Sequence, residues 1–344
     1  MSTFAPVDAW PAERVTSAAA WVHDLQMKIE TSSLKMGIKE PLVSVALCTY
    51  NGERYIIELL DSLVQQSYDH IEIVVVDDGS TDRTYEILSK YKSRFENIRL
   101  YRNEKNIGFA KNFEKAIKLC VGDYIALCDQ DDIWHLSKIE CLVQNMNSNV
   151  LIYHDSQFID QNGNPLDKKL SDVVNFYSGE EPEAFIFFNC ISSHALMFRK
   201  ALATHLFPFP EAGFHDAWIG YVACNLGRIS YLEKPLVRYR QHRGSATDIL
   251  KLKGRKIRPE KSRKYLANLN YIKRCKGLGI NKNPEIISKL SHMYENRTKK
   301  IFSWPLFLFF IVNFERFFAI YKKGFWSKLN FAYKESRGIK LTKP

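Results

Sequence analysis

Apolar runs alternate with segments of helical spacing along the first third of the chain. Residues 42–50 (LVSVALCTY) form a continuous, partly β-branched run, whereas residues 53–66 (ERYIIELLDSLVQQ) carry apolar positions three or four residues apart. The same alternation predicts further strands at 71–82, 98–103 and 124–128 and helices at 84–95 and 108–120. Continuous apolar strands between helices are typical of a parallel sheet that is buried on both faces. The pattern therefore predicts an α/β fold with helices on both faces of the sheet.

Polar clusters follow three of these predicted strands. They are TYNGE (49–53), DDGSTD (77–82) and DQDD (129–132). Ligands of such sheets bind outside the carboxyl ends of the strands. Because the three clusters fall at the same edge of one sheet, we expect a binding site there.

The third cluster gathers negative charge directly after the apolar run 124–128. Asp129, Asp131 and Asp132 stand close enough in sequence to repel one another, and each resists desolvation. An acidic loop at a strand end is the simple interpretation. A divalent cation is the sharper one, because carboxylates bind Mg2+ or Mn2+ together with substrate phosphates.

Other nucleotide-binding classes lack their motifs in this chain. No G-x-G-x-x-G follows the first strand, and no G-x-x-x-x-G-K-[ST] occurs, which argues against a dinucleotide dehydrogenase and a P-loop phosphotransferase. Seven cysteines are scattered without a C-x-x-C pair. That spacing argues against a zinc site or a disulfide framework and is typical of a reducing cytoplasm. The first residues lack the basic start and apolar core of a secretory signal.

Several motifs in order resemble one enzyme family. They are VSVALCTYNGERYIIELLDSLVQQSYDHIEIVVVDDGSTDRT, NIGFAKNFEKAI, GDYIALCDQDDIW and HDAW, within about residues 42–245. This stretch resembles the family 2 inverting glycosyltransferases of the GT-A fold. The resemblance implies a nucleotide-diphosphate-sugar donor, Mn2+ or Mg2+ as cofactor, and a single-displacement transfer of the sugar.

The resemblance also assigns roles to individual positions. Asp216 in HDAW matches the general base that takes a proton from the acceptor hydroxyl, although a helix-capping Asp would also fit the sequence there. Metal ligation falls to Asp131 and Asp129, with His242 as a third ligand or a structural histidine. The positions that match the nucleotide and donor site are Thr49, Tyr50, Asn51, Asp77, Asp78, Ser80, Lys111, Asn112 and Asp129.

The donor sugar is a finer question. CDQDDIW, YHDSQFID, HDAW and LVRYRQH resemble most the bacterial rhamnosyltransferases of O-antigen, capsule and cell-wall polysaccharide synthesis. That resemblance implies dTDP-L-rhamnose as donor and a lipid-linked saccharide as acceptor. Nothing in the residues separates rhamnose from another hexose, an N-acetylhexosamine or galactofuranose.

Charge divides the chain unevenly. Residues 251–344 hold 24 lysines and arginines against 5 carboxylates, a balance of +19, whereas residues 1–250 hold 25 and 33, a balance of −8. Such asymmetry indicates a polyanionic partner, either nucleic acid or an anionic membrane face. No recognised nucleic-acid-binding motif accompanies the charge, and a non-enzymatic polyanion-binding protein remains the remote alternative to a transferase.

The apolar segment IFSWPLFLFFIVNF (301–314) favours the membrane. It is shorter than the roughly 20 apolar residues that span a bilayer, and lysines flank it, as in an interfacial helix. A core helix packed on the catalytic domain is the alternative. We therefore expect a helical extension at 1–40, with an amphipathic helix at 12–30, a GT-A catalytic domain at 41–250 and a basic membrane-associating helical region at 251–344. The expected location is cytoplasmic, peripheral on the inner face of the cytoplasmic membrane.

Overall fold

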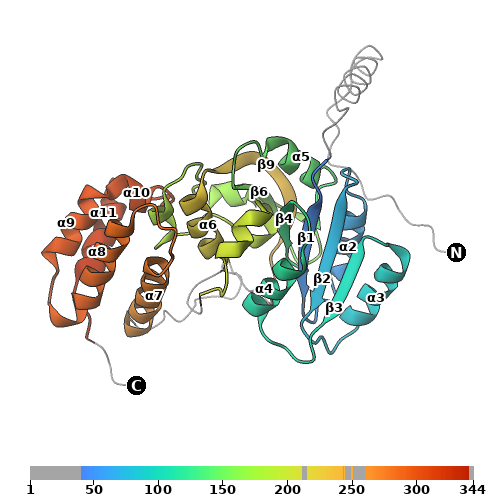
Figure 1. Ribbon diagram of the computed structural model, residues 1–344, viewed down its shortest axis with the longest axis horizontal. Coiled ribbons are helices and arrows are strands. Elements are labelled where there is room, and N and C mark those ends of the chain that lie inside the picture. Colours follow the sequence, from blue (N-terminus) through green and yellow to red (C-terminus); the bar gives the residue numbers. More distant parts are fainter. Residues whose placement is uncertain (1–39, 211–214, 243, 245–248, 251–260, 341–344) are drawn as a thin grey trace, which may run out of the picture. The chain divides into compact units, whose positions relative to one another are not determined.

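The computed structural model describes residues 40–210, 215–242, 244, 249–250 and 261–340. Pro41–Pro344 forms one compact unit, and its strands and C-terminal helices can be followed in Figure 1. The helix predicted at 12–30 lies outside the described residues.

Four parallel strands build the first half of the sheet in the order β3-β2-β1-β4. Their bounds are β1 Val43–Thr49, β2 Ile71–Asp77, β3 Ile98–Arg102 and β4 Tyr124–Cys128. Each strand lies where the apolar runs predicted it. Every residue of β2 is buried, as expected for a parallel strand covered on both faces.

The second half of the sheet is mixed and was not predicted. The order continues β4-β8-β6-β9-β5, with β7 paired to β6. Strand β8 runs antiparallel to both β4 and β6, whereas β6 and β9 run parallel. The bounds are β5 Ile133–Trp134, β6 Leu151–Ile159, β7 Pro165–Lys169, β8 Leu196–Arg199 and β9 Ile229–Arg240.

Helices cover both faces of the sheet, as predicted. Helices α2 (Ile56–Val64), α3 (Thr84–Arg94) and α5 (Lys138–Asn145) share one core with alternate residues of β1 and β2. Helices α4 (Phe109–Leu119) and α6 (His215–Leu226) share the other core with the intervening residues. The period of two along each strand thus divides its side chains between two helical layers.

The basic C-terminal region is helical. Its elements are α7 Lys261–Lys276, α8 Pro284–Glu295, α9 Trp304–Val312, α10 Phe314–Phe318 and α11 Phe325–Ser336. The short 3-10 turns of the chain are η1 Leu170–Asp172, η2 Pro182–Phe185, η3 Ser193–Ala195, η4 Lys200–His205 and η5 Asn296–Lys299. Side chains of α7 to α11 belong to the same hydrophobic core as α4 and α6.

Helix α9 has one buried and one exposed apolar face. Leu306 and Phe310 are fully buried, while Trp304, Leu308 and Val312 are 66%, 57% and 83% exposed. The segment therefore contributes to the core and still presents apolar side chains to solvent. Among the helices of the described residues, none has the length and apolar character needed to cross a bilayer.

Candidate functional site

A cavity of about 720 Å³ lies at the carboxyl ends of β1, β2 and β4. The residues predicted from sequence that line it are Thr49, Tyr50, Asp78, Asn112, Asp129, Asp131, Asp216 and His242. These come from segments far apart in the chain. The edge of the sheet where the polar clusters were expected to meet is thus the wall of one cavity.

Three predicted donor-site residues, Asn51, Asp77 and Ser80, do not line the cavity but bond to one another beside it. Asp77 is fully buried and accepts hydrogen bonds from Thr49 Oγ1 (3.0 Å), Ser80 N (3.0 Å) and Ser80 Oγ (2.5 Å). Asn51 N donates to Ser80 Oγ at 2.9 Å. These hydrogen bonds connect the loop after β1 to the loop after β2. Lys111, by contrast, is exposed on α4 and is not part of the cavity lining.

Asp78 is held by donors on both oxygens. Its Oδ1 accepts from Asn103 Nδ2 (2.7 Å) and Ile107 N (2.9 Å), and its Oδ2 accepts from Gly108 N (3.0 Å). Asn103 Nδ2 also donates to Asn112 Oδ1 at 2.8 Å. The carboxylate therefore fixes the turn that enters α4, where Gly108 has a φ of 87° that favours glycine.

Asp131 and His242 form a pair at the cavity wall. The Nε2 atom of His242 lies 2.9 Å from Asp131 Oδ2. Both side chains retain some exposure, 18% for His242 and 19% for Asp131. A carboxylate and an imidazole that face a cavity at this separation are suitable ligands for one divalent cation.

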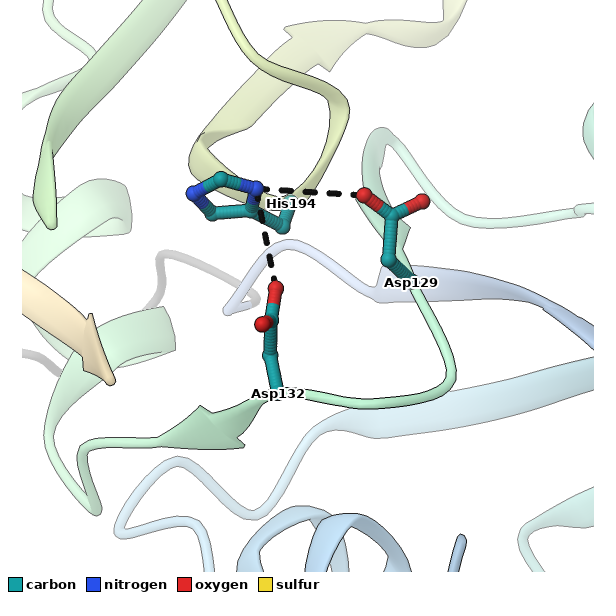
Figure 2. Close-up of side chains that lie close together, drawn as sticks. All are labelled: Asp129, Asp132 and His194. Atoms are coloured by element: carbon teal, nitrogen blue, oxygen red, sulfur yellow. Dashed lines mark ion pairs between the residues drawn. The ribbon is translucent and has the colours of Figure 1, made fainter. Parts of the chain in front are cut away.

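A second group of possible metal ligands lies deeper (Figure 2). His194 Nδ1 is 3.8 Å from Asp129 Oδ2 and 3.6 Å from Asp132 Oδ2. All three ligand atoms lie within 4.8 Å of one another. Asp132 and His194 are almost fully buried, and Asp132 Oδ2 has no hydrogen-bond partner within the described part of the chain. Asp129, which the sequence predicted to bind a metal together with Asp131, belongs to this second group.

Burial sets the protonation of this deeper group. It raises the pKa of Asp132 well above its ordinary value, and the neighbouring charges of Asp131 and Asp129 raise that pKa further. Burial also lowers the pKa of His194, whose Nε2 lies 2.9 Å from Ser156 Oγ. Desolvation disfavours the charged form of both side chains.

A buried lysine supports the same group. Lys138 is fully buried, its Nζ donates to the His194 carbonyl at 2.6 Å and lies 3.1 Å from the centroid of the Trp134 ring. Burial lowers the pKa of this ammonium to about 7. Sequence reasoning missed both His194 and Lys138. The signal for His194 was its position before the short apolar run that forms β8; nothing local distinguishes Lys138 from an ordinary residue at a helix start.

Asp216 lies in the first turn of α6 and lines the cavity. Burial raises the pKa of this carboxyl to about 7, against the hydrogen bond from Ala217 N to Oδ1 (2.8 Å), which favours the ionised form. The preceding His215 also lines the cavity; its ring stacks on Phe113 at 4.7 Å. Its Nε2 lies 2.9 Å from Ser193 Oγ. A carboxyl with a pKa near neutrality suits proton transfer.

One cavity combines three kinds of group. Asp129 and Asp131 form its acidic edge, and Asp216 is a separate carboxyl. The imidazoles are those of His194, His215 and His242. The acidic edge has ligands for a divalent cation. Such an ion would offset the repulsion between these carboxylates and a negatively charged diphosphate. Asp216 supplies a carboxyl for proton transfer in the same space. The cavity thus holds the groups that metal-assisted group transfer to a hydroxyl requires.

The chain is similar in sequence to known glycosyltransferases. Residues 44–206 match the model of glycosyl transferase family 2. An uncharacterized glycosyltransferase of Methanocaldococcus jannaschii is 30% identical over 210 residues, which cover 58% of this chain and 71% of that protein. TuaG of Bacillus subtilis, a putative teichuronic acid biosynthesis glycosyltransferase, is 37% identical over 131 residues, which cover 38% of this chain and 52% of TuaG. The chain therefore spans about half the length of TuaG.

A solved structure shares the fold. S. aureus TarS 1-349 in complex with UDP-GlcNAc superposes with a TM-score of 0.55 at 21% identity, covering 74% of this chain and 72% of that one. The predicted GT-A-type sheet is confirmed. Because the M. jannaschii relative shares 30% of aligned residues over more than two thirds of its length, and the family model matches the strands that carry the acidic edge, this chain belongs to glycosyltransferase family 2.

Proposed function

We propose that the chain transfers a sugar, with inversion, from a nucleotide-diphosphate sugar to a hydroxyl of a saccharide acceptor in bacterial cell-surface polysaccharide synthesis. One observation carries the proposal: a single cavity is lined by Asp78, by the acidic edge at Asp129 and Asp131, and by Asp216. The UDP-GlcNAc bound to TarS supports a nucleotide-sugar donor. The assignment of TuaG to teichuronic acid biosynthesis supports a polysaccharide product.

The donor would lie along the edge of the sheet. Asp78 would contact the nucleotide base, with Thr49, Tyr50 and Asn112 beside it. Tyr50 is fixed by Gln130, whose Oε1 accepts from Tyr50 N at 2.8 Å and whose Nε2 donates to Tyr50 O at 3.0 Å. Asn51, Asp77 and Ser80 would act indirectly, through the hydrogen bonds that join the two loops. Lys111 is the weakest of the proposed donor contacts because it is exposed.

The ligand set fits Mn2+ or Mg2+. Two carboxylates and an imidazole at the cavity wall match the oxygen-rich chemistry of these ions. We assign direct ligation to Asp131 and His242 with Asp129, because this set is more accessible to a diphosphate than Asp132 and His194. When bound, such an ion supplies Lewis-acid stabilisation of the charge on the leaving diphosphate.

Asp216 would take the proton of the acceptor. The acceptor oxygen attacks the anomeric carbon of the donor sugar, and the bond from that carbon to the diphosphate oxygen breaks. The nucleoside diphosphate leaves with the electron pair, and the hydroxyl proton passes to the ionised Asp216. The carboxyl group must therefore be deprotonated before each transfer.

The first prediction concerns the donor. We propose dTDP-L-rhamnose, on the resemblance of CDQDDIW and LVRYRQH to rhamnosyltransferases. Purified protein with Mn2+ should release nucleoside diphosphate faster from dTDP-L-rhamnose than from UDP-glucose, UDP-N-acetylglucosamine or UDP-galactofuranose. The assay is a panel of donors read out as free nucleoside diphosphate. Faster release from a UDP-sugar would replace the rhamnose assignment and leave the transferase proposal standing.

The second prediction separates the two ligand sets. Asp131→Ala should abolish transfer and Mn2+-dependent donor binding, because it removes a ligand atom 2.9 Å from His242 Nε2. Asp132→Asn is the matched control: an amide keeps an acceptor for Arg240 N, which donates to Asp132 Oδ1 at 2.8 Å. Donor titrations by calorimetry with and without Mn2+ make the comparison. Loss of Mn2+ dependence in Asp132→Asn alone would assign the ion to the Asp129, Asp132 and His194 group.

The third prediction concerns the base. Asp216→Asn should leave donor affinity nearly unchanged and lower turnover about 100-fold or more, the scale of general base catalysis. In the unaltered protein, kcat/KM should fall as pH drops below about 7, because protonation of Asp216 removes the base. The variant should lose this acid limb. Weakened donor binding with an unchanged pH profile would remove Asp216 from the base role.

A membrane location completes the proposal, because a lipid-linked acceptor stays in the bilayer. Exposed apolar side chains gather on and beside α9 and α11; those most exposed are Ile301, Val312, Trp326, Trp304, Phe325 and Leu308, at 95%, 83%, 78%, 66%, 58% and 57%. Lysines flank these segments in sequence at 299–300 and 322–323. We propose that this apolar patch inserts into the interface of an anionic membrane on its cytoplasmic side.

The fourth prediction tests this location by sedimentation with vesicles. The full chain should pellet with phosphatidylglycerol vesicles at low salt and retain part of this binding in about 1 M NaCl, because salt screens charge but not apolar insertion. Trp304→Ser with Trp326→Ser should remove the salt-resistant part. Ile57→Ser with Val121→Ser, two residues exposed elsewhere, is the control and should bind normally. A full chain that stays in the supernatant at low salt would contradict the membrane location.

A further inference from the structure

A second cavity, of about 290 Å³, lies among the C-terminal helices and shares no lining residue with the donor cavity. Elements α7, α8, η5 and α11 supply most of its wall. The charged residues of this wall are Lys261, Lys264, Arg297, Lys334, Glu335 and Arg337. Five cations and one carboxylate give the wall a formal charge of +4. We call this cavity the basic pocket.

The single carboxylate of the basic pocket is already engaged. Glu335 Oε2 accepts from Arg297 Nη1 at 2.8 Å and from Tyr294 Oη at 2.7 Å. Glu335 Oε1 lies 3.6 Å from Lys264 Nζ. Lys261, Lys334 and Arg337 have no ion pair within 4.0 Å among the described residues. Three cations thus face the same concave surface with no carboxylate partner in the described part of the chain, and a concave cationic surface concentrates anions.

Arg297 gives the pocket a rigid cationic floor. The residue is 3% exposed, and its guanidinium lies 4.5 Å from the Tyr294 ring centroid and 5.5 Å from that of Tyr265. Its Nη2 also donates to the Arg337 carbonyl at 3.2 Å. Its hydrogen bonds hold the buried guanidinium in place, and the exposed side chains of Lys261, Lys264 and Lys334 add further donors around it. This combination suits the tetrahedral oxygens of a phosphate group.

The rim of the basic pocket is joined to the apolar patch. Gly338, a lining residue, donates its N–H to the Ile301 carbonyl at 2.7 Å, and Arg337 pairs with Phe302 in an isolated β-bridge. The Phe302 ring lies 4.9 Å from the ring of the exposed Trp304. The backbone pairing of residues 301–302 with 337–338 therefore places Arg337 of the pocket next to the exposed apolar side chains. A soluble anion would make no favourable contact with the apolar side chains at the rim, whereas a lipid presents phosphate and hydrocarbon together.

From this juxtaposition we propose that the basic pocket binds the phosphate of an anionic membrane-lipid headgroup, with the acyl chains beside the apolar patch. The proposal rests on the membrane location given under Proposed function and adds a specific headgroup site to it. Lipid attachment in this pocket would hold the chain at the bilayer surface where a lipid-linked acceptor is found.

The fifth prediction compares two charge-matched double variants of the full chain. Lys334→Gln with Arg337→Gln removes two cations of the basic pocket, and both side chains are exposed, so the fold should survive. Lys276→Gln with Lys289→Gln removes two exposed cations of the C-terminal helices that lie outside both the pocket and the lysines that flank the apolar patch. Affinity for phosphatidylglycerol vesicles should fall about tenfold or more in the pocket variant, because two cations that would contact the headgroup phosphate are lost. The control should lose no more than about threefold.

Inorganic phosphate distinguishes a phosphate site from general attraction. At constant ionic strength, phosphate should displace the unaltered chain from the vesicles more effectively than chloride does, and this difference should disappear in the pocket variant. Equal losses of vesicle affinity in the two double variants, or equal displacement by phosphate and chloride, would overturn the proposed headgroup site. The proposed membrane location would still stand. If phosphate stabilises the unaltered chain while the pocket variant binds vesicles normally, the site binds a soluble anion. That result would overturn the proposal that a lipid headgroup occupies it.

Failure of the unaltered chain to bind any anionic vesicle would overturn both the location and the pocket. Release of nucleoside diphosphate from the donor, measured in parallel without lipid, is independent of these outcomes. Both double variants should keep that activity, because their substitutions lie outside the donor cavity.

Discussion

The rest of the site depends on how this fold holds several carboxylates at the end of buried strands. Asp77, Asp78 and Asp132 are each almost fully buried at one edge of the sheet. An ionised carboxylate there is stable only when donors surround it. Hydroxyl and backbone N–H groups satisfy Asp77, and Asn103 with two backbone N–H groups satisfies Asp78. The loops that carry these donors are therefore held in place by their hydrogen bonds to Asp77 and Asp78.

The first half of the sheet was predictable because β1, β2 and β4 are parallel strands buried on both faces, so that each is a largely apolar run in the sequence. β3 (IRLYR) is only partly buried. β4 spans residues 124–128, as predicted. The second half left no such pattern: β9 (ISYLEKPLVRYR) contains charges and a proline, and β8 is only four residues long. Their positions depend on pairing with distant strands. Local periodicity does not report such pairing.

The site divides in the same way. Asp78, Asp131 and Asp216 stand in motifs that the sequence displays, and all three line the cavity. His194 reaches Asp129 and Asp132 from a segment distant in sequence. Lys138 follows these carboxylates closely in sequence, and its burial and its hydrogen bond to the His194 carbonyl depend on the fold. Lys111 shows the converse: its motif was visible, yet the rotation of α4 leaves its side chain exposed and buries Asn112 instead. A motif fixes which residues are near a site, and the helix phase decides which of them face it.

The C-terminal helices show why membrane binding must be tested with point substitutions. The Phe187 ring contacts the rings of Tyr294, Phe310, Phe317 and Phe331 at centroid distances of 5.6 to 6.1 Å. Removing residues 251–344 would expose this cluster. Losing one buried phenylalanine side chain costs about 3–5 kcal/mol, and a domain is stable by only about 5–15 kcal/mol. A truncated chain would therefore lose its fold together with its membrane contact, whereas replacing Trp304, Lys334 or Arg337 alters the exposed surface and leaves the core in place.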